Sequence, residues 1–231
     1  MMKKIIFYLL FILFAVQLQA QTYTLKFKTN KGNFEVMLYD FTPLHRDLIL
    51  NEIKKGTYKN AEFNRVIKNF VIQGGELDET ILKREKNNLS QKPIRLTSEF
   101  HSKAFHKIGA LGAGHEGNVD KASYLTQIYF VVGKKVTAEE LDTLEEKKGI
   151  KYTPLQREEY LKNGGLPRLD NEYTVFGEIT KGLKKAIKIS LAPTDDQDVP
   201  TKSIVFDIKV KMKSNHNKYK TSISFGAGFN N

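Results

Sequence analysis

The chain contains no cysteine among its 231 residues, which excludes disulfide bonds, a thiol nucleophile, an iron–sulfur cluster and a cysteine-based zinc site. Its five histidines are scattered, without a pair four residues apart, so we assign none of them as a metal ligand. The aspartate-rich run 194–200 lacks the glycine and the glutamate that a calcium loop needs, and it predicts a turn. Serines and acidic residues form no nucleophile-elbow or triad pattern. We therefore expect no metal and no cofactor.

Negative charge is also scarce, with 26 acidic against 37 basic residues and a formal net charge of +11. An excess of this size suits nucleic acid, anionic headgroups or acidic polypeptides as partners. The lysines are nevertheless spread singly or in pairs, and no RRM, helix-turn-helix or zinc-finger motif accompanies them. We therefore expect a solvated basic surface and no nucleic acid partner.

The N-terminus has the three parts of a secretory signal peptide. Two lysines within residues 1–4 precede an apolar run at 5–16, and Ala20 is the expected last residue removed. As a helix, residues 5–20 would span about 24 Å, less than the roughly 30 Å hydrocarbon core of a bilayer. We expect signal peptide 1–20, a periplasmic or secreted protein and no stable membrane insertion after cleavage. The alternative is a protein anchored in the membrane by an uncleaved N-terminus.

Period-2 alternation dominates the rest of the chain. It predicts a hairpin at 23–38 and further strands at 63–73, 107–113, 127–132, 174–179 and 204–212. Helical patterns are fewer, and they predict helices at 43–56, 137–149, 154–163 and 183–190. Thr42 is the expected N-cap of the first helix, and Thr137 with Glu140 forms an expected capping box for the second. Residues 76–98 read as a long polar loop.

Many short strands with few helices predict a mainly β protein, either a barrel or a sandwich. The first and last strands are both strongly patterned, which favours a closed barrel whose ends meet. With 40% apolar residues the chain is expected to form one domain, at 21–213, followed by a loose tail at 214–231.

Residues 63–76 (FNRVIKNFVIQGGE) carry the most chemical information. Arg65, Phe70 and Gln73 supply a rigid donor fork, an aromatic wall and an amide within residues 65–73, a stretch that contains no acid and no metal ligand pair. Such a site suits a neutral, apolar ligand that receives one strong hydrogen bond. On these residues alone, Arg65 is equally well explained as an arginine that snorkels or pairs with a carboxylate, and a lone Phe70 as a core residue.

The segment resembles the signature of the cyclophilin-type peptidyl-prolyl isomerases, and three further blocks resemble the same family in the same order: 107–111 (KIGAL), 127–132 (QIYFVV) and 169–178 (LDNEYTVFGE). The resemblance covers about residues 23–213. It implies a closed eight-stranded antiparallel β-barrel capped by two α-helices, with a helical insertion at 134–168. It also implies a monomer that binds proline-containing polypeptides.

The resemblance implies site residues position by position. Arg65 matches the catalytic arginine, and Gln73 matches the glutamine that hydrogen-bonds the substrate backbone. The expected walls of the proline pocket and of the adjoining groove are Phe70, Val71, Tyr129, Leu169, Tyr173, Gln127, Gly114 and His115. The chain departs from the family at Asn64, where His is usual, and at Tyr129, where Phe is usual.

Two further departures concern the groove. Arg168 stands where some members have Trp, and residues 124–126 (Tyr-Leu-Thr) replace a small Gly-Ser pair and are expected to crowd the groove. The implied function is isomerisation of X–Pro bonds in exported or unfolded polypeptides, which assists their folding. The alternative is a chaperone or scaffold that binds proline segments with weak or no turnover.

Overall fold

The computed structural model describes residues 23–88 and 93–212. The predicted signal peptide, 1–20, and the predicted tail, 214–231, lie outside these residues. Among the described residues, no helix is long and apolar enough to span a bilayer.

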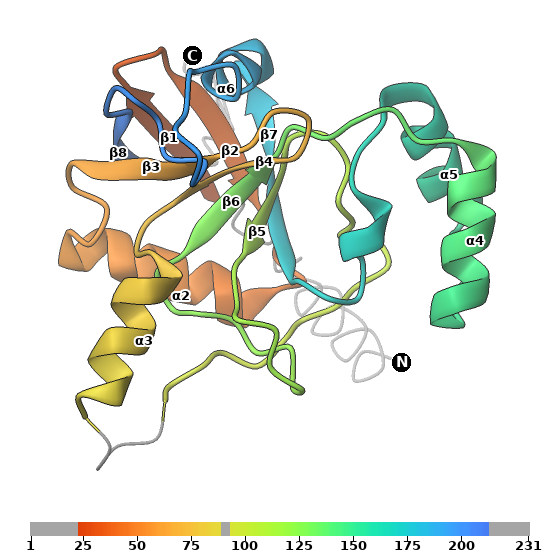
Figure 1. Cartoon of the computed structure of the whole chain (residues 1–231), viewed down its shortest axis with the longest axis horizontal. Coiled ribbons are helices and arrows are strands. Elements are labelled where there is room, and N and C mark those ends of the chain that lie inside the picture. The colour runs from red at the N-terminus through yellow and green to blue at the C-terminus, as the bar shows by residue number, and fades with distance from the viewer. Residues whose placement is uncertain (1–22, 89–92, 213–231) are drawn as a thin grey trace, which may run out of the picture.

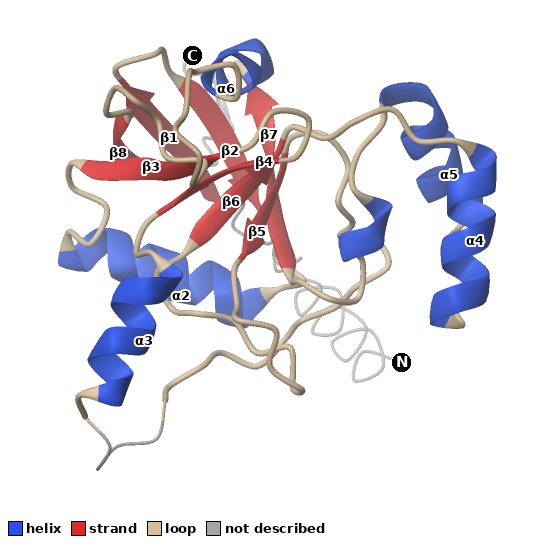
Figure 2. Cartoon of the chain, viewed as in Figure 1, coloured by secondary structure: helices blue, strands red, loops and turns tan. Residues whose placement is uncertain are grey.

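The architecture is a closed antiparallel β-barrel, which confirms the expected fold (Figures 1 and 2). Around the barrel the strands run β1-β2-β7-β5-β6-β4-β3-β8, so that the first and last strands meet as the sequence pattern suggested. The strands are β1 Tyr23–Thr29, β2 Phe34–Leu38, β3 Ala61–Val66, β4 Val71–Gly74, β5 Ala110–Ala113, β6 Ile128–Val131, β7 Val175–Lys181 and β8 Val205–Met212.

The barrel interior is a packed aromatic and aliphatic core. Phe27, Phe34 and Phe130 contact one another with ring centroids 4.9–5.1 Å apart, in one stacked and two edge-to-face pairs. These rings are fully or almost fully buried. Because the interior is filled, a ligand site has to lie on the outer face of the barrel or at its rim.

Two helices close the ends of the barrel, α2 (Pro43–Lys55) and α6 (Leu183–Ile189), as Figure 1 shows. Gly56 ends α2 in the left-handed conformation, as its sequence indicates. Thr42 occupies the predicted N-cap position, but its side chain makes no capping bond. Glu99 instead accepts the backbone N–H groups of Leu44 and His45 at 3.0 and 2.8 Å. A carboxylate from a distant segment therefore makes the capping hydrogen bonds that a local side chain usually makes.

Two sequence predictions about local structure were wrong. Residues 63–73 form two strands, β3 and β4, because a tight turn at 67–70 places Asn69 in the left-handed conformation. The expected loop 76–98 contains a helix, α3 (Asp78–Lys86). Its composition is polar because only Ile81 on it is buried.

The insertion 134–168 is helical, as expected, with α4 (Ala138–Lys148), α5 (Pro154–Asn163) and the single 3-10 turn η1 (Pro167–Leu169). Figure 1 shows α4 and α5 packed beside each other, away from the barrel wall. Thr137 accepts from the Glu140 backbone N–H, whereas the full reciprocal capping box lies at Thr153 and Gln156 on α5. The insertion has its own small core, in which Phe105, Leu141 and Tyr160 are buried together.

Candidate active site

The site lies on the outer face of four adjacent strands and is completed by residues of the loops beside them. Arg65, Gln73, Tyr129 and Gly112 are successive cross-strand partners on β3, β4, β6 and β5. The next row of partners, Val66, Ile72, Phe130 and Leu111, belongs to the barrel core. Because side chains alternate along a strand, the first row must face out.

A β-bulge turns Arg65 to this outer face. Phe63 and Val66 both point into the core, although residues three apart on a regular strand face opposite sides. The register shift between Phe63 and Arg65 makes Asn64 the extra residue. The Asn64 amide donates to the carbonyl of Gly75 at 2.6 Å and holds the bulge in place. The departure from the usual His therefore lies at the residue that aims Arg65.

Beside Arg65 lies a pocket of about 250 Å³ that brings together nine of the ten predicted site residues. Gln73 is the exception. It is buried in the row between Arg65 and Tyr129 but does not line the pocket, so its role in binding substrate backbone stays a prediction. Arg168 completes the lining. The lining residues are Arg65, Phe70, Val71, Gly114, His115, Gln127, Tyr129, Arg168, Leu169 and Tyr173.

Arg65 is only loosely paired. Its Nε lies 3.7 Å from Oδ2 of Asp198, and the two side chains are 40% and 42% exposed. Exposed ion pairs of this kind contribute little, so the guanidinium remains available to a ligand. Asp198 belongs to the predicted turn 194–200, whose backbone is fixed by the Val66 N–H donating to the Asp198 carbonyl at 2.8 Å. The sequence pattern did not single out Asp198, because only the fold brings it to Arg65.

Tyr129 forms one wall of the pocket and is held from behind by a buried relay of hydrogen bonds. His106 Nδ1 donates to Asp170 Oδ1 at 2.7 Å, so Nε2 is left to accept from the Tyr129 hydroxyl, also at 2.7 Å. Tyr160 of α5 donates to the other Asp170 oxygen at 2.5 Å. Burial raises the pKa of Tyr129 well above its ordinary value, and the hydroxyl stays protonated.

This relay explains how a tyrosine occupies a position where an apolar ring is usual. The hydroxyl is committed to His106, and a Cβ on Gly112 would lie only 2.2 Å from the Tyr129 ring, so glycine there makes room for it. The pocket therefore meets the ring of Tyr129 and not an unpaired polar atom. His106 and Asp170 lie in different segments of the sequence, and no local spacing predicts their contact.

The adjoining wall consists of His115 stacked on Tyr173, with ring centroids 4.1 Å apart, and the Tyr173 ring meets the Tyr129 ring edge to face at 6.1 Å. His115 Nδ1 accepts from the Gly117 N–H at 2.8 Å, so Nε2 carries the proton and donates to the Glu172 carbonyl at 2.8 Å. Both ring nitrogens are engaged by backbone groups. His115 therefore serves as a wall and offers no free base to the pocket.

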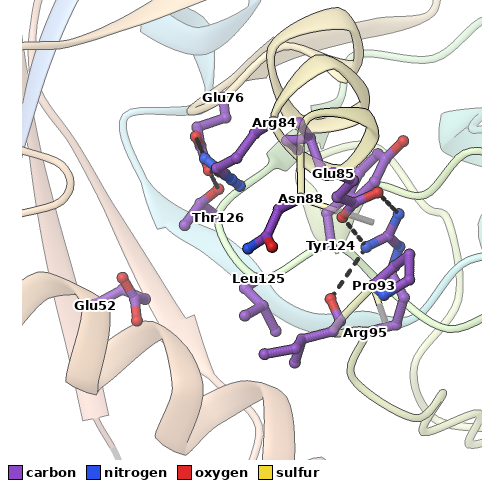
Figure 3. A pocket seen from close by; sticks show the side chains of 12 residues that line it. Glu52, Glu76, Arg84, Glu85, Asn88, Pro93, Arg95, Tyr124, Leu125 and Thr126 are labelled. Carbon is purple, nitrogen blue, oxygen red and sulfur yellow. Dashed lines mark hydrogen bonds and ion pairs between the residues drawn. The ribbon is translucent and has the colours of Figure 1, made fainter. Parts of the chain in front are cut away.

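The predicted crowding by residues 124–126 is not found in this pocket. Tyr124 is buried, and all three residues line a neighbouring pocket of about 290 Å³ instead (Figure 3). Thr126 hydrogen-bonds Glu76 at 2.6 Å, while the next residue, Gln127, lines the Arg65 pocket. The segment thus forms the partition between two pockets and leaves the first one open.

A second buried histidine forms a triad-like arrangement with an acid and a serine, which the sequence pattern did not reveal. His45 Nδ1 bonds Glu99 at 2.7 Å and Nε2 bonds the Ser123 hydroxyl at 3.0 Å. Ser123 is fully buried and lines neither of the two pockets, so this arrangement offers no nucleophile to a substrate. Within residues 23–88 and 93–212 no cluster of three metal-ligating side chains occurs.

Comparison with known proteins decides the family. The family model described as "Cyclophilin type peptidyl-prolyl cis-trans isomerase/CLD" matches residues 24–210. The chain belongs to the cyclophilin family. The resemblance inferred from four sequence blocks is confirmed, and with it the class of enzyme, a peptidyl-prolyl cis-trans isomerase.

Two curated relatives match this cyclophilin over most of their length and most of its own. A Staphylococcus haemolyticus protein named "Putative peptidyl-prolyl cis-trans isomerase" is 31% identical over 180 residues, covering 78% of this chain and 86% of the relative. A Staphylococcus saprophyticus protein of the same name is 30% identical over 180 residues, with the same coverage of the two chains.

Solved structures show the same fold. A Cryptosporidium parvum cyclophilin type peptidyl-prolyl cis-trans isomerase matches this cyclophilin with a TM-score of 0.57 at 19% identity, over 84% of this chain and 99% of its own. A second structure of that protein, in the presence of the dipeptide Ala-Pro, matches with a TM-score of 0.55 at 18% identity, over 83% and 99%.

Proposed function

We propose that this isomerase turns over X–Pro bonds at the Arg65 pocket, with Arg65 as the catalytic group, and that it acts on exported or unfolded polypeptides. The observation that carries the proposal is the position of Arg65, a loosely paired guanidinium that lines the same pocket as Phe70, Tyr129 and Leu169. The Cryptosporidium structure in the presence of Ala-Pro supports a proline-containing ligand for a protein of this fold.

The geometry suits prolyl isomerisation in its simplest form. Rotation about a peptide bond meets a barrier of about 18–20 kcal/mol, because the nitrogen lone pair is delocalised into the carbonyl. In the twisted transition state the lone pair returns to nitrogen and can accept a hydrogen bond. A guanidinium is a permanent cation with a rigid fork of donors, so Arg65 binds the twisted form better than either planar form. No covalent intermediate is required.

The apolar walls have a separate task. Phe70, Leu169 and the ring of Tyr129 exclude water, which would otherwise stabilise the planar, polar amide and weaken the hydrogen bond from Arg65. Gln73, if it reaches the substrate backbone, would hold one side of the bond while the other side rotates. The strand register supports this role only by placing Gln73 directly beside Arg65.

The decisive experiment compares Arg65→Ala with the wild type in a proline-peptide isomerisation assay. We expect kcat/KM to fall about 10²–10³-fold, the range seen when one transition-state donor is removed. The melting temperature should stay unchanged because the side chain is partly exposed and weakly paired. Arg157→Ala is the matched control, since Arg157 also pairs with an aspartate, Asp142, but lies on α5 outside the pocket. Undiminished turnover in Arg65→Ala would refute the assignment.

The same assay separates an isomerase from a binder. Peptide binding without exchange broadening in NMR spectra would favour the chaperone or scaffold alternative.

Export is tested by fractionating cells and measuring the intact mass of the protein. A chain that begins near Gln21 outside the cytoplasm supports cleavage after Ala20, whereas a full-length chain in the membrane fraction supports the anchored alternative.

A further inference from the structure

Arg168 differs from every other arginine in the sequence. There are six arginines, and five of them have a carboxylate oxygen within 4 Å: Arg46, Arg65, Arg84, Arg95 and Arg157. Within residues 23–88 and 93–212, Arg168 has no such carboxylate. It is also exposed, and it lines the pocket that contains Arg65. A charge without a counterion at the mouth of a binding site points to a counterion on the ligand.

The backbone of Arg168 is held in place, whereas its guanidinium group remains available to bind a ligand. Its backbone belongs to η1, and its carbonyl accepts a hydrogen bond from Lys148 Nζ at 2.8 Å. The preceding carbonyl, of Pro167, accepts from the Tyr152 hydroxyl at 2.9 Å. The guanidinium lies over the Phe70 ring, 4.6 Å from its centroid, in a cation–π contact that leaves its edge N–H groups unused. The fork is thereby pre-oriented beside the pocket.

The carboxylates around the pocket are already engaged by other groups. Asp198 pairs with Arg65, Asp78 accepts from the Gln127 amide, and Glu172 contacts Lys121 and Lys148. Burial raises the pKa of the Tyr173 phenol, and the positive charge of Arg168 is the first influence that opposes this rise. Arg168 therefore acts on the pocket as a charge that its surroundings do not cancel.

We propose that Arg168 is a specificity-determining residue that selects proline segments carrying an aspartate or glutamate side chain next to the proline. The inference rests on the proposed function and names its substrate class. A planar guanidinium stacked on an aromatic ring presents two parallel N–H groups to a carboxylate, which lysine or tryptophan at this position does not. The carboxylate can belong to the residue before or after the proline, and the experiment distinguishes the two.

The test uses two peptide series with the full mature protein. In Ala-Xaa-Pro-Phe the residue before proline is Glu, Gln or Lys, and in Ala-Ala-Pro-Xaa the same three residues follow it. The measured quantity is the ratio of kcat/KM for Glu to kcat/KM for Gln, because the two side chains differ in charge and hardly in shape. For the wild type we expect a ratio of about two to five in one of the series, the size of an exposed ion pair. Salt should reduce it.

Variants assign the preference to Arg168. In Arg168→Gln the ratio should fall to about one, in Arg168→Lys it should be intermediate, and in Arg157→Gln it should equal that of the wild type. A wild-type ratio of one in both series would overturn the proposal, as would a ratio that survives in Arg168→Gln. An equal loss on all peptides in Arg168→Gln would show that the residue is only a wall on Phe70. If the wild type turns over none of the peptides, the proposed function fails instead.

Discussion

Two buried histidines in this cyclophilin make nearly the same hydrogen bonds. His106 connects Asp170 to the Tyr129 hydroxyl, and His45 connects Glu99 to the Ser123 hydroxyl. In each, Nδ1 faces a carboxylate at 2.7 Å and Nε2 faces a hydroxyl. On hydrogen-bond geometry alone, the His45 relay would be the better candidate for a catalytic site, because it ends at a serine hydroxyl.

The two relays differ in whether their last residue lines a pocket. The ring of Tyr129 lines the Arg65 pocket, whereas Ser123 is fully buried and lines neither pocket described above. The His45 relay instead fastens three segments of chain, because Glu99 also caps the first turn of α2. A constellation of catalytic residue types is therefore a site only where a substrate can reach it.

The relays differ in the second bond to their carboxylate as well. Asp170 is buried and held by the Tyr160 hydroxyl, so the His106 relay ties the insertion helix α5 to the pocket wall. The Glu99 side chain is 12% exposed and accepts two backbone N–H groups. Loss of His45 would leave Glu99 with two backbone N–H groups and some contact with water. Loss of His106 would leave the buried Asp170 with the Tyr160 hydroxyl and one backbone N–H, and the buried Tyr129 hydroxyl without its acceptor.

The largest effect that tests this contrast comes from replacing each histidine by leucine. His106→Leu should lower the free energy of unfolding by about 2–5 kcal/mol, because it removes one bond to the buried Asp170 carboxylate and leaves the Tyr129 hydroxyl without an acceptor. His45→Leu should lower it by about 1–3 kcal/mol, because the Glu99 carboxylate keeps its other bonds. Urea titration of both variants measures the two values. Equal losses would show that the relays are energetically alike and that the exposure of Glu99 does not matter.

Tyr129→Phe is the next test, and it separates the packing of the pocket from its chemistry. The ring that faces the pocket is preserved, so kcat/KM should stay within about twofold of the wild type. His106 Nε2 loses its donor in a dry environment, and the free energy of unfolding should fall by about 1–3 kcal/mol. Peptide isomerisation and urea titration on the same sample measure both. A large loss of turnover with little loss of stability would mean that the hydroxyl itself contacts substrate.

The contrast also shows what the sequence could predict. The FNRVIKNFVIQGGE segment and the three further blocks identified Arg65 and six of its neighbours in the pocket, because these residues lie in motifs with local spacing. Gly114 and His115 were identified from the loop that follows residues 107–111. Asp198, His106 and Asp170 were missed, since each reaches the site only through closure of the barrel. The bulge at Asn64 was missed too, although it decides that Arg65 faces outward.

The predictions of local structure also failed where the deciding contact or turn was not evident from the neighbouring residues. Thr42 was correctly predicted at the N-cap position of α2, whereas the capping hydrogen bonds come from Glu99 in a distant segment. The turn within 63–73 went unnoticed because the apolar residues on both sides of it suit a single strand. Asn69, which adopts the left-handed conformation there, was the available signal.

Ser123→Ala tests the weaker relay directly. We expect a loss of about 1–3 kcal/mol in the free energy of unfolding, because His45 Nε2 is left buried without its partner, and unchanged isomerase turnover. The wild type and the variant should both leave peptide and ester substrates uncleaved, because Ser123 is fully buried. Hydrolysis by the wild type that disappears in Ser123→Ala would show that the His45 relay opens to solvent and that burial was the wrong criterion.

The smallest expected effect is on pH dependence, and it concerns His45. Burial lowers the pKa of His45 below its ordinary value of 6.5, and the Glu99 carboxylate only partly opposes this. Between the lowered value and 6.5 the unfolded chain binds a proton that the folded chain does not, so this residue's contribution to stability is complete above pH 6.5 and declines as the pH falls. His45→Gln removes that contribution. Chemical denaturation from pH 7.5 to 5 should therefore show a smaller decline in the variant than in the wild type, and an equal decline would place the acid sensitivity in other groups.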